Sequence, residues 1–392
     1  ADMIIAVTYA DEVNMVACQV AHSLFNVPTK IARIRQQSFL DPVWADLFSR
    51  DHMPIDVIIS PEAEVAKAID RRLAVPGAFD MIPLAEDNVR VIGVRCSEKC
   101  PIVNTPLRQL TELFPDLNVV VVGISRDGDV WIPTSRDQML PGDEVYFVSE
   151  TEHVSRVMEI FGYEEIEASR LVIVGGGYVG RNLAKLIEER EGVTAKIIEM
   201  DRERARKIAE TVPETTVLQG DIFDQEILAE SNISSADTIV AVTDDDETNV
   251  LGSLLAKQIG VKQAIALVKR DSYASLVTKL GVDILVNPRS IIVSQILRHV
   301  RQGKIRSVYS LWEGFGEIIE AEVMETSSLV GATLGDKKLP RGVIIGAIVR
   351  DSKVLIPRVD TDIRTGDRVI LLAATGTIRE VEKLFAVRLD FM

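Results

Sequence analysis

The sequence predicts an α/β protein in tandem duplication, in which each half is a doubly wound parallel sheet followed by a small α+β domain. Three observations lead to this prediction. The chain aligns with itself in four ordered blocks, apolar strand-sized segments alternate with amphipathic segments in the larger part of each half, and short strands separated by turn residues fill the smaller part. At 392 residues, several domains of ~100 to 200 residues each are expected.

Composition and charge exclude several classes of protein. Hydrophobic residues make up 47% and charged residues 26%, which is typical of a globular chain and not of a disordered one. The longest apolar runs, such as residues 119–124, are far shorter than the ~20 residues of a membrane-spanning helix. The formal charge of -15 argues against wholesale binding to nucleic acid or anionic lipid. Three cysteines, Cys18, Cys96 and Cys100, are too few for a disulfide framework and favour a reducing cytosol.

The internal repeat is the strongest single feature of the chain. Residues 1–14 align with residues 236–249, and nine of the fourteen positions are identical. Three further blocks follow in the same order, pairing residues 32–39 with 266–273, 55–61 with 282–288, and 126–148 with 350–372. Chance similarity between strand-rich segments would not keep four blocks in register, so the sequence predicts a duplicated fold.

The two halves differ at their beginnings. Residues 169–235 have no counterpart in the first half, which is therefore about 66 residues shorter (236 − 170). Either the first half evolved without this segment or the chain begins part-way through a domain. We favour the second alternative, because residue 1 opens on a strand prepared to pair with missing neighbours. The expected domains are residues 1–85, 86–163, 164–301 and 302–392.

The second half shows the complete order of elements. Residues 171–174 are an apolar run, residues 175–180 a glycine turn, residues 181–191 an amphipathic stretch and residues 195–198 a second apolar run. The alternation continues to about residue 286, and this spacing predicts a parallel sheet with right-handed crossovers and helices on both faces, a Rossmann-like nucleotide-binding domain. Short strands are then expected at 317–323, 343–349, 353–356 and 368–372, with helices at 291–300 and 376–385.

The glycine turn is the principal candidate for a binding site. Gly175, Gly177 and Gly180 follow a strand and open a helix. In such a turn the first glycine permits the bend, the second lets the backbone approach a pyrophosphate, and the third lets helix and strand pack closely. Glu199 ends the next strand, where a carboxylate accepts hydrogen bonds from ribose hydroxyls and repels a 2′-phosphate. The turn predicts NAD(H) or an adenine nucleotide over NADP, a preference that Arg202 close by moderates.

Further polar residues follow the third and fourth strands of the second half. Asp221 follows the third strand, within reach of an adenine, while Thr243, Asp244 and Asp245 follow the fourth and line the crevice at the carboxyl ends of the strands. Each is also an ordinary turn or cap residue, so turn chemistry is the alternative for every one of them. Their common position at strand ends favours nucleotide binding.

The first half keeps only part of this site. Thr8 and Tyr9 stand where the second half has Thr243 and Asp244. Arg33 ends a buried strand and either neutralises a phosphate or forms a structural ion pair. Without a glycine turn, this half-site is expected to bind nothing well.

Groups for catalysis are not evident. The four histidines are scattered, Cys96 and Cys100 lack partners for a zinc site, and no Ser-His-Asp order appears. The acidic residues 244–247 either bind a metal or start a helix, and we favour the helix start. A nucleotide site without catalytic groups predicts a sensor. The alternative is an NAD-dependent oxidoreductase that uses the small domain as its substrate site.

The order of motifs resembles a known family. The segments VIVGGGYVGRNLA, KIIEMDRERARKIAE, VLQGDIFDQEIL, ADTIVAVTDDDETNVL and TGDRVILLA resemble, in this order, an RCK domain (regulator of potassium conductance) with its C-terminal partner domain. Two such units on one chain resemble the regulatory subunits of Trk-type bacterial potassium uptake systems. The resemblance covers essentially all 392 residues. It departs from the family at the start, because members carry a glycine turn in both halves.

The resemblance implies a function and a site. It implies a non-enzymatic gating ring that binds NAD(H) and ATP or ADP, assembles as a homo-oligomer (dimer or tetramer), and docks on a potassium-conducting integral membrane subunit at the cytoplasmic face of the bacterial inner membrane. No nucleic acid and no direct membrane insertion are expected. Residue by residue, the implied nucleotide site is Gly175, Gly176, Gly177, Tyr178, Val179, Gly180, Glu199, Asp221, Thr243 and Asp244, with Thr8, Tyr9 and Arg33 left from the first site.

Overall fold

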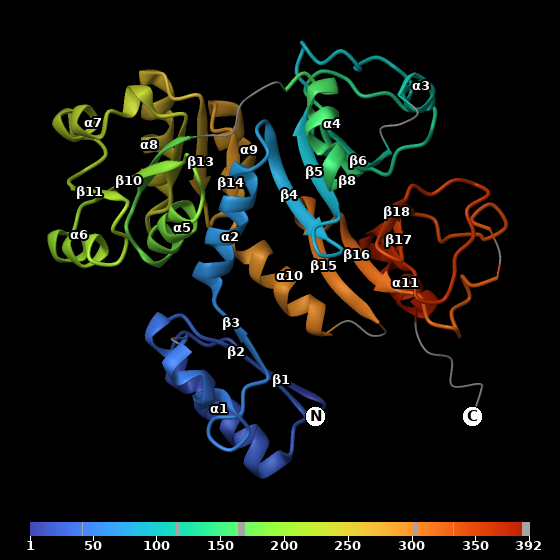
Figure 1. Cartoon of the computed structure of the whole chain (residues 1–392), viewed down its shortest axis with the longest axis horizontal. Coiled ribbons are helices and arrows are strands. Elements are labelled where there is room, and N and C mark those ends of the chain that lie inside the picture. Colours follow the sequence, from blue (N-terminus) through green and yellow to red (C-terminus); the bar gives the residue numbers. More distant parts are fainter. Residues whose placement is uncertain (41, 115–117, 164–168, 301–303, 332, 386–392) are drawn as a thin grey trace. The chain divides into compact units, whose positions relative to one another are not determined.

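The computed structural model describes residues 1–40, 42–114, 118–163, 169–300, 304–331 and 333–385. The chain divides into two compact units, each assembled from both halves of the repeat (Figure 1). Unit 1 comprises Ala1–Ile69, Arg170–Val282 and Val286–Ile292, and unit 2 comprises Asp70–Ser169, Asp283–Leu285 and Val293–Met392. Among the described residues, no helix combines the length and the apolar character needed to cross a membrane.

Unit 1 contains the predicted doubly wound sheet. Its six strands lie in the order β11-β10-β9-β12-β13-β14, and the pairings of β9, β10 and β12 with their neighbours are all parallel. The strands are β9 (Arg170–Val174), β10 (Thr194–Glu199), β11 (Thr216–Gln219), β12 (Thr238–Ala241), β13 (Gln263–Leu267) and β14 (Ile284–Val286). The helices between them are α5 (Tyr178–Glu188), α6 (Arg202–Ala209), α7 (Gln225–Ser231), α8 (Asp246–Ile259) and α9 (Asp271–Leu280). The strand order reverses between β9 and β12, which is where doubly wound sheets bind ligands.

The first half contributes a smaller parallel sheet to unit 1, in the order β1-β2-β3. Its elements are β1 (Met3–Ala6), α1 (Asp11–Phe25), β2 (Thr29–Arg33), β3 (Val57–Ile59) and α2 (Pro61–Leu73). Two 3₁₀ segments, η1 (Gln37–Leu40) and η2 (Pro42–Phe48), stand where the second half has α9. Lys30 is fully buried, and its Nζ lies 2.7 Å from the carboxylate of Asp56, which satisfies the buried charge.

Unit 2 holds two small domains with the same strand order, which confirms the predicted duplication. In the first domain the order is β4-β5-β8-β6-β7, and in the second it is β15-β16-β19-β17-β18. The first domain contains β4 (Ala78–Leu84), β5 (Val89–Arg95), α3 (Leu107–Leu113), β6 (Val119–Arg126), β7 (Asp129–Trp131), β8 (Glu144–Glu150), η3 (Thr151–His153) and α4 (Val154–Ile160). The second contains β15 (Ile305–Leu311), η5 (Trp312–Gly314), β16 (Gly316–Glu322), β17 (Val343–Arg350), β18 (Lys353–Leu355), β19 (Arg368–Ala374), η6 (Thr375–Thr377) and α11 (Ile378–Phe385). The helix expected at 291–300 is α10 (Pro288–Val300).

One strand of the second small domain was not predicted from the sequence. Strand β15 lies at the edge of its sheet, and its residues Arg306, Ser307 and Ser310 are interspersed with buried Val308 and Leu311. An edge strand of this kind carries polar residues and little continuous apolar sequence, so the sequence pattern that would predict a strand is weak.

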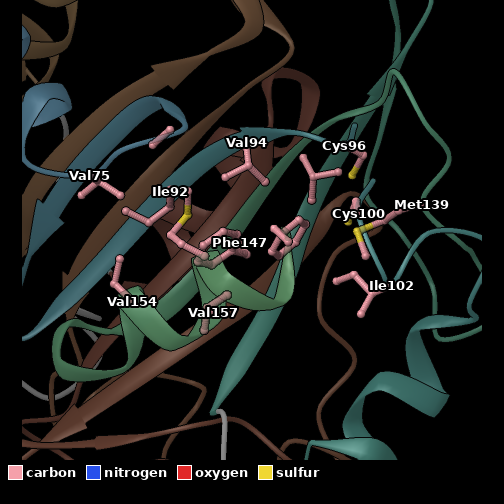
Figure 2. Close-up of a cluster of buried hydrophobic side chains, with 14 of the residues drawn as sticks. Val75, Ile92, Val94, Cys96, Cys100, Ile102, Met139, Phe147, Val154 and Val157 are labelled. Carbon is pink, nitrogen blue, oxygen red and sulfur yellow. The ribbon is translucent and has the colours of Figure 1, made fainter. Parts of the chain in front are cut away.

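Each small domain buries a core under one face of its sheet. In the first domain α4 covers that face, and Phe147 stacks on Phe161 with ring centroids 5.3 Å apart (Figure 2). Cys96 and Cys100 belong to the same core, which explains them as small apolar residues. In the second domain α11 provides the corresponding cover, with Phe385 fully buried.

A buried carboxylate closes the same turn in both small domains. Asp143 accepts two hydrogen bonds of 2.8 Å from the Arg126 guanidinium, and Asp367 accepts two of 2.8 Å from Arg350. Each carboxylate also accepts a backbone N–H at 2.7 Å, from Leu140 and Arg364 respectively. Both aspartates are 1% exposed, so each turn depends on a paired, nearly water-free charge.

We therefore expect Asp143→Asn and Asp367→Asn each to destabilise unit 2. Losing one partner of a buried, bidentate pair costs about 3 kcal/mol, which corresponds to a melting temperature lower by roughly 6–12 °C in a domain of this size. Differential scanning calorimetry of the full chain measures this shift. Asp129→Asn, at an exposed position on β7, is the matched control, and an equal shift in the control would contradict the prediction.

Candidate nucleotide-binding site

The glycine turn joins β9 to α5 in the geometry that the sequence predicts. Gly175 has φ +99°, in the left-handed region, and its N–H donates to the Ile198 carbonyl at 2.9 Å. A Cβ added to Gly180 would lie 2.0 Å from the Gly175 carbonyl oxygen. These two glycines are required by the fold itself, because no side chain fits between the start of the helix and the strand.

Gly177 has a different environment. It is the N-cap residue of α5 with φ −62°, a value open to any residue, and a Cβ built on it meets no atom within 4 Å. As a glycine, the N-cap residue has no side chain with which to cap the helix. The fold therefore gives no internal reason for glycine here, whereas an anion approaching the free N–H groups of the first turn would need the open space.

Glu199 holds the turn in place. The side chain is 4% exposed, and its two oxygens accept the N–H groups of Gly176 and Asp201, each at 2.8 Å. An ionised carboxylate can accept further bonds, so this role is compatible with the expected ribose contact, which stays a prediction. A cation also lies beside this carboxylate, because Arg204 Nη1 is 3.5 Å from it.

Asp221 and Asp244 lie at strand ends as predicted, and both are exposed. Asp221 accepts the Phe223 N–H at 3.0 Å, a turn contact that leaves its second oxygen free for a ligand. The carboxylate of Asp244 lies 3.5 Å from Lys269 Nζ, which also donates to the Asp244 carbonyl at 2.7 Å. Lys269 and Asp244 are both exposed, so a ligand can displace the contacts between them at little cost.

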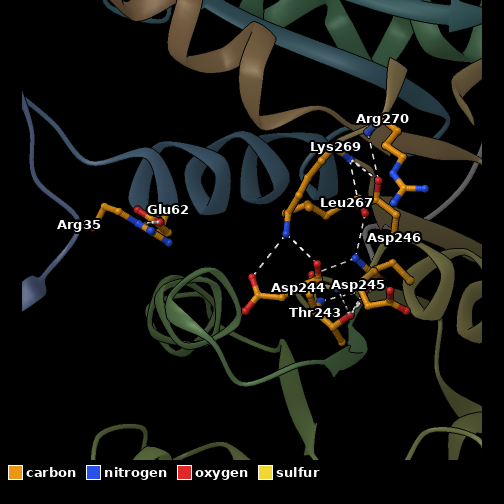
Figure 3. Close-up of polar contacts among 10 residues, drawn as sticks. Arg35, Glu62, Thr243, Asp244, Asp245, Asp246, Leu267, Lys269 and Arg270 are labelled. Atoms are coloured by element: carbon orange, nitrogen blue, oxygen red, sulfur yellow. Dashed lines mark hydrogen bonds and ion pairs between the residues drawn. The ribbon is translucent and has the colours of Figure 1, made fainter. Parts of the chain in front are cut away.

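The acidic run 244–247 starts a helix, as favoured from the sequence (Figure 3). Asp245 is the N-cap residue of α8 and accepts the Thr248 N–H at 2.8 Å. Asp246 is 5% exposed and accepts the backbone N–H groups of Lys269 and Arg270 at 3.0 and 3.1 Å. These contacts fix the loop that follows β13 against the start of α8.

A polar clamp behind Thr243 was missed by the sequence analysis. Asn249 is fully buried, and its Oδ1 accepts both the N–H and the hydroxyl of Thr243 at 2.8 and 2.7 Å. Its Nδ2 donates to the carbonyls of Thr243 and Leu267 at 3.0 and 2.9 Å. All four hydrogen bonds recur in the first half, where Asn14 bonds Thr8 and the Arg33 carbonyl. The repeat already marked these residues, because the threonine and the asparagine are identical in the aligned blocks.

The remaining first-half residues have partners within the protein. Tyr9 is 86% exposed, and its carbonyl accepts a hydrogen bond of 3.4 Å from Arg33 Nη2. Arg33 thus contacts a backbone carbonyl, and the structural ion pair considered for it is not the contact observed. The ion pair in this region is Arg35 with Glu62, at 2.7 Å (Figure 3).

A cleft of about 860 Å³ brings the predicted second-half residues together. It is lined by Gly175, Gly176, Gly177, Tyr178, Val179, Glu199, Asp221, Thr243 and Asp244. Gly180 packs against the Gly175 carbonyl. Asp245 also lines the cleft, as predicted, and the charged lining residues that were not predicted are Arg35, Glu62, Arg181, Arg204, Lys207 and Lys269. A large cleft with cations beside a glycine turn suits a ligand that carries both phosphate and ribose groups.

Comparison with known proteins identifies the family. The TrkA-N domain family matches residues 1–61 and 171–288, and the TrkA-C domain family matches residues 85–162 and 318–386. The chain belongs to the TrkA family. It is 51% identical over 392 residues to the Trk system potassium uptake protein TrkA of Azorhizobium caulinodans, covering all of this chain and 86% of that protein. The TrkA of Haemophilus influenzae is 38% identical over 389 residues, which cover 98% of this chain and 84% of that protein.

Solved structures show the same fold as this TrkA family member. The GsuK RCK domain superposes with a TM-score of 0.57 at 19% identity, covering 99% of this chain and 81% of the other. The GsuK channel bound to NAD superposes with a TM-score of 0.56 at 18% identity, covering 99% and 67%. The predicted Rossmann-like, tandem fold is thereby confirmed.

The two kinds of glycine in this TrkA-N turn give a direct test. Gly180→Ala should lower the melting temperature of unit 1 by roughly 5 °C or more, because its Cβ overlaps the Gly175 carbonyl. Gly177→Ala should leave the melting temperature unchanged, because its Cβ meets open space. Calorimetry of both variants without nucleotide makes the comparison. A destabilised Gly177→Ala protein would show that the fold, and not a ligand, requires this glycine.

Proposed function

We propose that this chain is a non-enzymatic regulatory subunit of a Trk-type bacterial potassium uptake system, in which binding of NAD(H), ATP or ADP controls potassium transport. The TrkA relatives are named for potassium uptake, which supports the system. The nucleotide-binding cleft supports the form of control. The four-domain division at residues 85, 163 and 301 is part of this proposal.

The single observation that carries the proposal is the open space at Gly177. The start of α5 has no side-chain cap from Gly177, and no packing contact requires glycine there, so the helix start can accept an anion. The buried Glu199 lies close to it, because its carboxylate accepts the N–H of the preceding residue, Gly176. Phosphate at the helix and ribose at the carboxylate are the two halves of a nucleotide. GsuK, which shares the fold, has been solved with NAD, and this supports NAD(H) as one ligand here.

Regulation requires that the nucleotide distinguish two conformations. A ligand shifts an equilibrium only by its difference in affinity for the two states, so NAD(H) and adenine nucleotides must prefer different arrangements of the nucleotide-binding unit. The exposed pair of Lys269 with Asp244 can distinguish the ligands, because a phosphate bound at Lys269 would compete with the Asp244 carboxylate. The partner is a potassium-conducting membrane subunit, met by a homo-oligomer of this chain at the cytoplasmic face of the inner membrane.

The central experiment measures potassium flux through the reconstituted membrane subunit with and without this chain. We expect NADH and ATP to change the flux, and Gly177→Ala to abolish this change while still associating with the membrane subunit. A nucleotide effect that persists in the folded Gly177→Ala variant would contradict the proposed site. Steady consumption of NADH with a small carbonyl substrate would favour an oxidoreductase instead.

Substitution of Glu199 separates its two roles. Glu199→Gln retains one oxygen that can accept the Gly176 N–H but removes the charge that opposes a 2′-phosphate. We expect NADH affinity to fall by less than about tenfold and the preference for NADH over NADPH to shrink by about tenfold. Glu199→Ala should weaken both ligands, because the turn loses its tether. Isothermal titration calorimetry measures the affinities, and an unchanged NADH to NADPH ratio in Glu199→Gln would exclude the ribose contact.

A further inference from the structure

The two small domains of unit 2 share one hydrophobic core between them. Val122 and Tyr146 of the first domain and Leu311, Ile318 and Ile370 of the second belong to the same buried cluster. Strands at matching positions of the repeat, β6 and β17, pack against each other. The two domains are therefore related by an approximate twofold arrangement, in which each residue of one face has a counterpart on the other.

Side-chain size is not the same on the two sides of this arrangement. Trp312 lies against Gly123, where an added Cβ would meet the indole ring at 2.6 Å. Trp312 also packs edge-on against Tyr146, with ring centroids 4.6 Å apart. At the counterpart positions the repeat has Ala85 for Trp312 and Ala347 for Gly123, and both alanines are buried in the same cluster. One side thus pairs a large residue with a glycine, and the other pairs two small residues.

The charged residues at counterpart positions also differ between the two domains. The Trp312 Nε1–H donates to Glu144 at 3.4 Å, while Arg95 holds the other oxygen of that carboxylate at 2.7 Å. The counterpart of Glu144 is Arg368, which pairs with Glu86 and with the buried Glu320. The partners across the interface therefore differ between the sides, because Glu144 accepts the Trp312 N–H whereas Arg368 pairs with the Glu86 carboxylate.

The centre of the face shows a third difference. A Cβ added to Gly346 would lie 2.5 Å from Val148 and 3.3 Å from Val122. Val122 is itself the counterpart of Gly346. The close approach of β6 and β17 thus depends on glycine on one side only.

We propose that these differences restrict the face of each small domain to the other small domain, so that pairing is always between first and second and never between two copies of the same domain. In a pair of first domains, Glu86 would face Glu144, Ala85 would leave the space of the indole empty, and valine would replace the close-packed glycine. In a pair of second domains, Trp312 would overlap the side chain of Ala347, and its N–H would face Arg368. Contacts between chains must then use surfaces other than this face.

Cross-linking in the full chain tests the rule. Positions 122 and 346 are counterparts in contact, so a pair of first domains would place two copies of position 122 together. The native cysteines are first replaced by their counterparts in the repeat, as Cys18→Ser, Cys96→Val and Cys100→Ser. Val148→Ala is added to make room for the new side chain at position 346. We expect Val122→Cys combined with Gly346→Cys in this background to form a disulfide between positions 122 and 346 on oxidation, identified by peptide mass spectrometry. Val122→Cys alone should give no 122–122 link, and such a link in comparable yield would overturn the proposal.

A size exchange tests the same rule without cysteines. Gly123→Ala and Trp312→Ala should each lower the melting temperature of the full chain, by about 5 °C. The double variant recreates the alanine pair found at the counterpart positions, and its loss should be smaller than the sum of the single losses by about 3 °C or more. Gly376→Ala, which meets open space, is the control glycine. Strictly additive losses would overturn the proposed size match.

Discussion

The contact on which the nucleotide cleft depends is the one between Gly180 at the start of α5 and the carbonyl of Gly175 at the end of β9. Because no side chain separates helix from strand there, the first turn of α5 points its free N–H groups into the crevice where the strand order reverses. The tether from Gly176 to Glu199 then ties this helix start to the neighbouring strand β10. Backbone groups, held by packing, thus form the side of the cleft at the start of α5, while side chains form the rest.

Features that arise from local backbone chemistry could be predicted from the sequence, and features that arise from pairing distant segments could not. The glycine turn, the order of strands and helices, and the helix start at residues 244–247 each follow from a few adjacent residues. The pairing of Arg204 with Glu199 depends on which way a helical side chain points, and the edge strand β15 depends on the sheet that pairs with it. The Asn249 clamp was predictable only in part. The repeat shows that the asparagine occurs in both halves, but only the structure shows which groups it bonds.

The first half repeats the polar clamp that stands behind Thr243 in the second half. The Asn14 clamp keeps the loop after β1 in the conformation of its second-half counterpart, so the scaffold of the crevice is intact. Around it the chemistry differs, because Arg35 stands at the position of Lys269 and pairs with Glu62. The same hydrogen bonds beside different charges indicate that the asparagine contacts to the backbone determine the conformation of this loop.

Duplication on a single chain explains how such differences can accumulate. In a symmetric homodimer every substitution appears on both sides of the interface, so a tryptophan that needs a facing glycine would have to supply both at once. In this chain Trp312 and Gly123 belong to different halves, and each half carries one member of the pair. The exchange of Glu144 for Arg368 follows the same logic, since each has its own partner in the other half, the Trp312 N–H for Glu144 and the Glu86 carboxylate for Arg368. The same freedom lets Arg35 stand in one half where the other half has Lys269, so the charges beside the two equivalent loops differ within one unit.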